Sequence, residues 1–481
     1  MVSLHASWHR VVLGRRKPLA SARGGLSRRA AIALAAACAV AACSDDPDPE
    51  ADATPAPQTN TELENLLDGT QEVSVADESL NVKLLRRFYA RHGFEPVWTD
   101  RQTQVDSLVE AVLSAGDQGF NPEMFHADLL RHRAKLQPLD RELLLSDAFL
   151  SYADALARGA VPVERRKDDE TLTREPIDVT AVLDRALDRH DPAEVIESLA
   201  PTTPTYKALL QALQKYRSGA LGNGKAAADR VRTIEVNLER QRWLPRSLPA
   251  DRVWVNVADE RLVFYQDNKP TFTTRVVVGE DVEQNQSPEF RALIDASFYN
   301  PPWVIPKDIV TAEILPKLDH DPDYLTKNNM IMLANGDAEQ LPGPDAGLGL
   351  IMFDMPNRFD VYLHDTPDRK YIFNQDNRRI SHGCIRVQNP REFAALLMQE
   401  PIDAINEGIA AGATTRNDLP VPVPVFVVYQ TAFVDTDGKL QFRRDFYKRD
   451  ADIWQQLQKR SDDPDPTVQA DNRPASSGSV M

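Results

Sequence analysis

The chain has 481 residues, of which 42% are hydrophobic, and this length predicts two or three domains rather than a single core. Its formal net charge is −16; the first 42 residues contain seven Lys/Arg and no Asp/Glu, so the remainder holds 49 basic and 72 acidic residues and carries −23. A body this acidic excludes the nucleic-acid-binding class, and the lack of a second long apolar run excludes a multi-span membrane protein.

The N-terminal residues have the pattern of an export signal. Residues 1–29 are basic, and an Ala-rich apolar run too short for a permanent membrane helix follows. Small residues precede Cys43, which is typical of a lipoprotein cleavage site. We therefore expect residues 1–42 to be a leader, Cys43 to carry lipid, and the protein to lie in the periplasm or cell envelope, anchored to a membrane. The alternative is a plain signal peptide with Cys43 incidental.

The next segments differ sharply in composition. Residues 43–75 begin acidic and Pro-rich, which predicts a disordered tether. Residues 76–220 carry apolar residues at helical spacing, for example over 80–89 and 146–156, and predict an all-α domain. We expect a connector over 221–246.

The remainder predicts a β domain at residues 247–458 and a disordered tail at 459–481. Residues 308–333 inside the β domain have a helix-like pattern. The predicted fold class is therefore α+β and multidomain, with an all-α N-terminal domain followed by a mostly-β domain that carries a helical insertion. Short β-branched and aromatic runs predict strands at 253–257, 262–265, 273–278, 359–363 and 423–429.

One group of residues, Cys384 with His364 and Gly383, could carry out catalysis. Cys384 is the only cysteine after Cys43, so neither a disulfide framework nor a Cys-based zinc site can form in the body. A thiol becomes a nucleophile when a base such as His364, at the end of a predicted strand, takes its proton. Gly383 has no side chain and lets backbone N–H groups face a developing oxyanion. Taken alone, an inert core cysteine and a structural histidine would also fit.

The pattern His364, a spacer, and then Ser-His-Gly-Cys-Ile-Arg386 resembles the signature of YkuD-type L,D-transpeptidases. The resemblance covers about residues 80–458 and points to the large periplasmic, YcbB-like subgroup. That subgroup usually has a peptidoglycan-binding module after its α domain; here only about twenty residues join Tyr216 to Asn237, too few for a folded domain. The segments that carry the resemblance are 93–98, 237–245, 300–306, 313–317, 321–325 and 355–358.

The resemblance implies a scaffold domain followed by a transpeptidase sandwich, with a helical cap at about 305–345. It implies Cys384 as nucleophile and His364 as general base, while His382 next to the thiol leaves an ambiguity about the base. It further implies two sets of supporting residues. The orienting or oxyanion residues are Ser381, His382, Gly383 and Asp365. The substrate-binding residues are Tyr362, Arg386 and Trp303.

The activity so implied is transfer between peptidoglycan stem peptides. Cys384 would form a thioester with a tetrapeptide stem, release D-Ala and pass the acyl group to a second stem in a 3→3 crosslink, without a metal or organic cofactor. Carbapenem-type inhibitors would acylate Cys384. A lipoprotein lysine, a D-amino acid or water remain open as acceptors. The rival functions are a Cys–His peptidoglycan amidase or endopeptidase and a non-catalytic envelope scaffold.

Overall fold

The computed structural model describes residues 61–69, 72–188, 191–367 and 369–458. The predicted leader, Cys43 and the predicted tail at 459–481 lie outside these ranges and stay predictions. Within them, no helix combines the length and the apolar character needed to cross a bilayer. The predicted fold class is confirmed, because a helical region is followed by a β-rich domain with inserted helices.

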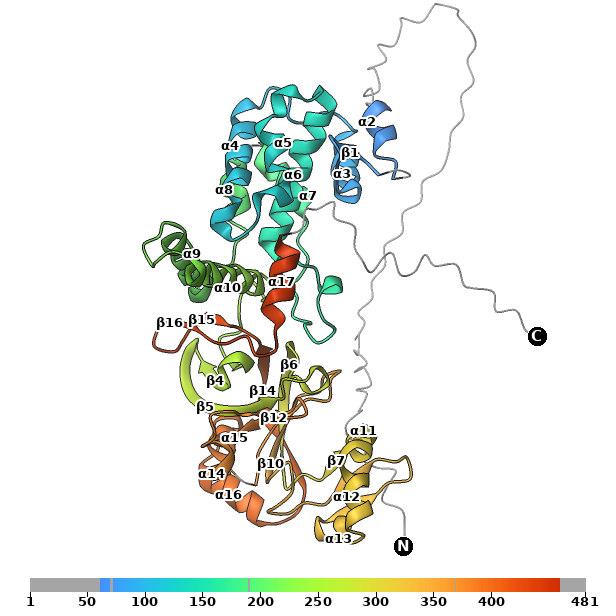
Figure 1. The fold of residues 1–481 in the computed structure, drawn as a ribbon, viewed down its shortest axis with the longest axis vertical. Helices are drawn as coiled ribbons and strands as arrows, with labels where there is room; N and C mark the ends of the chain where they lie inside the picture. The colour runs from blue at the N-terminus through green and yellow to red at the C-terminus, as the bar shows by residue number, and fades with distance from the viewer. Residues whose placement is uncertain (1–60, 70–71, 189–190, 368, 459–481) are drawn as a thin grey trace, which may run out of the picture. The chain divides into compact units, whose positions relative to one another are not determined.

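The helical region is built around α6, the long helix Pro138–Arg158, against which α3, α4, α7 and α8 pack (Figure 1). Pro138 stands in the first turn, where its missing N–H costs no hydrogen bond. Gly159 ends the helix with φ +97°, and a side chain there would collide with Trp243. The principal helices are α3 Val82–Tyr89, α4 Gln102–Leu113, α5 Ala127–Arg131, α6, α7 Val179–Asp188, α8 Pro192–Glu197, α9 Pro204–Arg217 and α10 Lys225–Arg242.

Two sequence-predicted boundaries differ from the structure. The tether predicted over 43–75 is wrong at its C-terminal end, because α2 spans Thr61–Leu66 and buries Leu63, while Leu67 is also fully buried. Leu63 and Leu67, which are spaced i and i+4, give this segment an apolar helix face despite its polar composition. The predicted connector at 221–246 contains α10, which packs along α9. A short hairpin, β1 Ser74–Val75 and β2 Glu78–Ser79, completes the N-terminal part.

The β-rich domain is one sheet in the order β12-β5-β13-β11-β10-β6-β14-β3-β4. β4 also pairs with β5, so the sheet closes around a single apolar core. The predicted sandwich is thus one continuous sheet folded over itself. Its strands are β3 Arg252–Asn256, β4 Arg261–Gln266, β5 Lys269–Gly279, β6 Phe290–Tyr299, β10 Ile351–Asp354, β11 Leu363–His364, β12 Arg379–Ser381, β13 Ile385–Val387 and β14 Thr415–Val428. The helices inserted after β11 and β13 are α14 Arg369–Ile372, α15 Pro390–Met398 and α16 Ile402–Ala410.

The predicted strand at 359–363 is wrong except for its last residue. The side chain of Asn357 accepts the N–H of Phe359 and donates to the carbonyls of Met355 and Val361, which closes a turn. Asp360 has φ +53°, so the backbone is not extended before Leu363.

The insertion after β6 forms a small folded cap with its own sheet, ordered β7-β9-β8, and its own apolar core. The helical prediction for 308–333 holds as far as Lys327, whereas its end is strand β8. The cap elements are β7 Trp303–Ile305, α11 Lys307–Ile309, a π-helical turn Val310–Ile314, α12 Leu315–His320, α13 Tyr324–Lys327, β8 Met330–Met332 and β9 Ala338–Gln340.

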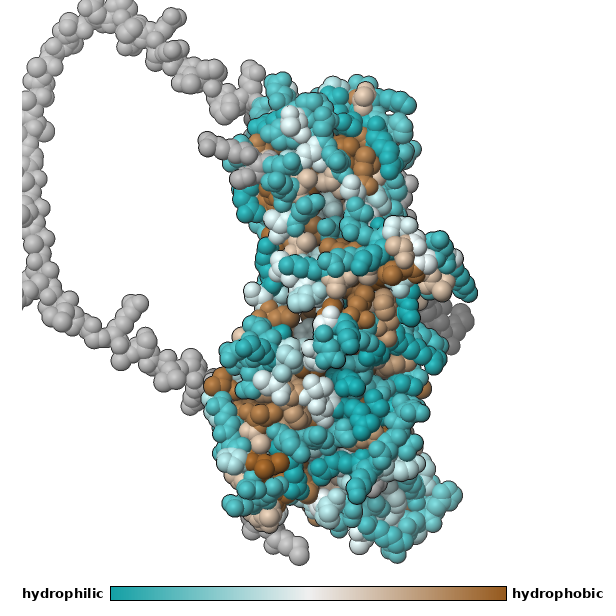
Figure 2. Space-filling model, turned by 90° about the vertical axis from the view of Figure 1, so that its left-hand side faces the viewer, coloured by the Kyte–Doolittle hydropathy of each residue, from teal (hydrophilic) through white to brown (hydrophobic). Residues whose placement is uncertain are grey.

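The last described helix, α17 (Arg449–Leu457), returns to the helical region (Figure 1). Its Ile453 and Leu457 are buried in the same apolar core as the N-terminal helices. A hairpin of β15 (Ala432–Val434) and β16 (Leu440–Phe442) precedes it. On the face in Figure 2, hydrophilic residues cover most of the surface and hydrophobic residues gather in small groups, as in most soluble domains.

Candidate active site

The register of two parallel strands brings the candidate residues together. His364 on β11 lies opposite Arg386 on β13, and the N–H of Ile385 donates to the carbonyl of Tyr362 at 2.9 Å. Side chains alternate between the two faces of a sheet. Tyr362, His364, Cys384 and Arg386 therefore project from the same face, with Cys384 as a diagonal neighbour of His364.

The Cys384 thiol is held in a neutral state. The residue is half-buried, and its Sγ lies 3.9 Å from the carbonyl of Asp360. Burial raises the pKa of the thiol, while the backbone N–H of Tyr362 and the charge of Arg386 act in the opposite direction. At neutral pH the thiol therefore needs a base before it can attack.

His364 is placed to be that base. It is buried, and its Nδ1 lies 2.6 Å from the carbonyl of Asp365, which can only accept, so Nδ1 is a hydrogen-bond donor; the backbone of Leu348 also hydrogen-bonds the imidazole. Burial, followed by the charge of Arg386, lowers the pKa of His364 to about 3. The imidazole is therefore neutral near pH 7, and the same burial makes it a weak base in the structure described.

Asp365 is itself fixed. Its carboxylate accepts the N–H groups of Leu350 at 3.0 Å and Thr366 at 2.7 Å, and it pairs with Arg369 at 3.1 Å. These contacts hold the carbonyl that His364 meets. The structure thus gives Asp365 a contact with the base through its backbone rather than its side chain.

The loop from Ser381 to Cys384, here called the nucleophile loop, is tied down by hydroxyl groups. Ser381 Oγ donates to the carbonyl of Cys384 at 2.5 Å and accepts the N–H of Gly383 at 3.3 Å. Gly383 has φ +109°, a conformation open to glycine. Its carbonyl accepts from Ser287 Oγ at 2.7 Å. Sequence reasoning missed Ser287, which lies far from the motif in the chain.

His382 points elsewhere. Its Nε2 lies 2.6 Å from Glu313 Oε1 in the cap, and about one third of its side chain is exposed. The contact joins the cap to the nucleophile loop. Glu313 stands in one of the family-like segments, but only folding reveals that it meets His382.

The predicted substrate-binding residues divide into two groups. Arg386 is half-buried with an Nε that has no hydrogen-bond partner among the described residues, and burial lowers its pKa. Burial raises the pKa of Tyr362 to about 12, so its hydroxyl stays protonated. Trp303 lies instead in the cap sheet, paired with Gln340 and packed so closely on Gly347 that a Cβ there would lie 2.9 Å from the indole.

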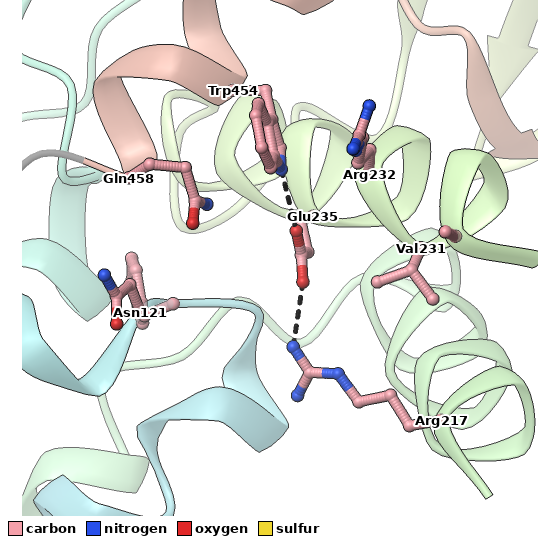
Figure 3. Close-up of a pocket in the computed structure, with 9 residues that line it drawn as sticks. Asn121, Arg217, Val231, Arg232, Glu235, Trp454 and Gln458 are labelled. Carbon is pink, nitrogen blue, oxygen red and sulfur yellow. Dashed lines mark hydrogen bonds and ion pairs between the residues drawn. The ribbon is translucent and has the colours of Figure 1, made fainter. Parts of the chain in front are cut away.

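A cavity of about 480 Å³ lies away from these residues, where α9, α10 and α17 meet (Figure 3). Glu235 bridges the two sides of this cavity, accepting from Arg217 at 2.8 Å and from the Trp454 indole at 3.1 Å. Glu235 thus pairs with polar groups on both sides, and no candidate catalytic residue lines the cavity. We place the active site by the geometry around Cys384 and not by the size of this cavity.

The class of protein follows from the β-rich domain. Residues 250–425 match the L,D-transpeptidase catalytic domain, YkuD, so the chain contains a catalytic domain of that family. Residues 83–213 match the Scaffold domain. The chain therefore combines a segment that matches a scaffold domain with a later segment that matches the L,D-transpeptidase catalytic domain.

The chain is also similar to individual known proteins. A Haemophilus influenzae protein described as "Putative L,D-transpeptidase" is 26% identical over 426 residues, which are 82% of this chain and 83% of that protein. Two solved structures are more distant: the Ldtfm–avibactam carbamoyl enzyme is 13% identical over 38% of this chain and 49% of its own, with a TM-score of 0.20. The L,D-transpeptidase from Mycobacterium smegmatis is 14% identical over 37% of this chain and 58% of its own, with a TM-score of 0.22.

Proposed function

We propose that this chain is a peptidoglycan L,D-transpeptidase that forms 3→3 crosslinks through a thioester on Cys384. The observation that carries the proposal is the placement of Cys384 and His364 on one sheet face, with a neutral imidazole beside a neutral thiol. The proposal fits the YkuD domain match and accounts for the buried state of His364.

In the first half-reaction, His364 Nε2 takes the proton of Cys384 Sγ. The thiolate attacks the carbonyl carbon of the third residue of a tetrapeptide stem, and negative charge develops on the carbonyl oxygen. The bond to the terminal D-Ala then breaks, the imidazolium gives its proton to the departing amine, and a thioester remains.

In the second half-reaction, the side-chain amine of another stem attacks the thioester carbonyl. His364 accepts a proton from the amine and returns it to the sulfur, so the free thiol is restored and the new amide is the 3→3 crosslink. The same steps serve for a lipoprotein lysine, a D-amino acid or water as acceptor.

Other residues would support these steps. The Cys384 N–H would face the oxyanion, while Ser381 accepts the N–H of Gly383 and fixes the turn. Arg386, whose Nε has no partner in the described structure, would attract a carboxylate of the stem, and Tyr362 would border the same groove.

The location of the enzyme would be the periplasm or cell envelope, where its substrate is. Lipid on Cys43 would anchor it to a membrane. Carbapenem-type inhibitors would acylate Cys384, because they too present a carbonyl that the thiolate can attack.

The proposal is tested by incubating the purified protein with tetrapeptide-rich sacculi and analysing the muropeptides by mass. Crosslinked 3→3 dimers and free D-Ala are expected from the wild type, and neither from a folded Cys384→Ala variant. Release of existing crosslinks without new ones would indicate an amidase or endopeptidase instead. A protein that yields no product and whose Cys384 resists carbapenems would be a non-catalytic scaffold.

A further inference from the structure

One short segment of the scaffold, residues 169–171, lies against the catalytic domain next to β6. Glu170 forms a parallel bridge with Glu289, the N–H of Glu289 donates to the carbonyl of Asp169 at 2.7 Å, and the N–H of Thr171 donates to the carbonyl of Glu289 at 2.9 Å. Residues 169–171 therefore lie alongside the chain just before β6 and are joined to it by an isolated parallel bridge.

Arg449 stabilises this contact between residues 169–171 and the chain before β6. It is fully buried, and its guanidinium pairs with Asp169 and with Glu289 at 3.4 Å. It also donates to the carbonyl of Ser287 at 3.2 Å. A buried guanidinium is stable only when such partners surround it, so its position fixes that of Ser287.

Ser287 connects Arg449 to the nucleophile loop through hydrogen bonds. Its hydroxyl accepts the N–H of Gly279 at 2.9 Å and donates to the carbonyl of Gly383 at 2.7 Å. Its own N–H donates to the Tyr447 hydroxyl at 3.1 Å, which in turn donates to the carbonyl of Gly279 at 2.7 Å. Ser287 is fully buried, so water does not compete for these bonds.

The bond to Gly383 matters because the peptide unit is planar and trans. The carbonyl of Gly383 and the N–H of Cys384 belong to one such unit and point in opposite directions. Holding the carbonyl therefore aims the N–H of Cys384 away from Ser287, and hydrogen bonding at the carbonyl also strengthens that N–H as a donor.

We propose that Ser287 is a positioning residue that aims the Cys384 N–H at the oxyanion, and that scaffold residue Asp169 holds Ser287 in place through Arg449. The inference rests on the proposed function. It makes the scaffold a working part of the active site, because oxyanion donors act only when held in place before the reaction.

The test compares acylation with alkylation of Cys384 in Ser287→Ala and Asp169→Asn variants of the full chain. Acylation by a carbapenem or a tetrapeptide stem develops an oxyanion, whereas alkylation by iodoacetamide does not. We expect acylation and the kcat for crosslinking to fall by about ten- to a hundredfold with KM nearly unchanged, and alkylation to stay within about twofold at every pH from 5 to 9.

Two matched variants serve as controls. Ser297→Ala removes another fully buried serine hydroxyl, one without a hydrogen-bond partner in the described structure. Asp154→Asn breaks another Asp–Arg pair, formed with Arg158 inside the scaffold. Both should acylate like the wild type. In addition, the Asp169→Asn and Ser287→Ala double variant should lose less than the product of the two single losses, because both changes act on one chain of contacts.

The results that overturn the inference are specific. Wild-type acylation by Ser287→Ala, or an equal loss of acylation and alkylation, would remove the positioning role. Fully multiplicative losses in the double variant would remove the link to the scaffold. If the wild type made no crosslinks, the proposed function would fail, while the carbapenem and iodoacetamide rates would still decide the role of Ser287.

Discussion

His126 lies at the centre of a buried charge cluster in the helical region. Its side chain is 1% exposed; Nδ1 lies 2.6 Å from Glu78 Oε2 and Nε2 lies 3.0 Å from Asp147 Oδ2. Burial alone lowers the pKa of His126, but hydrogen bonds to Asp147 and Glu78, and their charges, outweigh burial and raise the pKa to about 9. The cluster joins strand β2 to helix α6.

The size and sign of its contribution follow from linkage. The pKa rises from 6.5 to about 9, and each unit corresponds to about 1.4 kcal/mol. The protonated cluster therefore contributes on the order of 3 kcal/mol to the free energy of unfolding. Because the folded-state pKa is the higher one, this contribution is complete below about pH 6.5 and is lost as the pH rises through about 9.

The variant that tests this reasoning is His126→Gln, measured by urea unfolding at pH 6 and at pH 9.5. Trp98 is a suitable fluorescent reporter, because its indole donates to Ser146 beside Asp147. We expect a destabilisation of about 3 kcal/mol or more at pH 6, since two buried carboxylates lose their cation. At pH 9.5 the difference from the wild type should shrink by about 2 kcal/mol or more.

The control is His92→Gln, which removes another imidazole–carboxylate contact, with Asp184 at 2.7 Å, that is one-third exposed. It should cost less than about 1 kcal/mol. If the destabilisation by His126→Gln were the same at pH 6 and pH 9.5, the cluster would not hold a proton in the way described.

Three further predictions concern function. Alkylation of Cys384 between pH 5 and 8 should slow by about a hundredfold in His364→Ala and stay near wild type in His382→Ala; the opposite pattern would exchange the two roles. Glu313→Gln weakens the partly exposed contact between the cap and His382, and a looser cap would admit water to the thioester. The ratio of hydrolysed to crosslinked product should then rise by up to about fivefold. An unchanged ratio would show that this contact does not control the access of water. Cys43→Ser should move the mature protein from the membrane to the soluble envelope fraction, as fractionation would show.

The helical and β-rich parts could be predicted because their signals are local. Helical spacing over 80–89 and 146–156 gave α3 and α6, and β-branched runs gave β3, β4 and β5. The motif around Cys384 is also local, so both the candidate nucleophile and the candidate base could be named in advance. The strand at 359–363 failed because Asn357 closes a turn with its side chain, which composition does not reveal.

The supporting contacts of the site could not be predicted in this way. Ser287 meets Gly383, Glu313 meets His382, and Arg449 meets Asp169 across long stretches of chain. Each pair depends on which distant segments the tertiary fold brings together, and neither residue type nor spacing encodes that. Trp303 stays a predicted substrate-binding residue; its close packing on Gly347 within the cap could not be read from the sequence.

Helix α17 determines when the protein can finish folding. Ile453 and Leu457 fill the core of helices that lie hundreds of positions earlier in the sequence, so this core stays incomplete until the C-terminal helix has arrived. Contacts of such large sequence separation form slowly, so we expect this core to be completed late in folding. Cutting the chain between its two domains would leave the helical one with an open apolar surface. The two parts that follow one another in the sequence thus contribute residues to one apolar core.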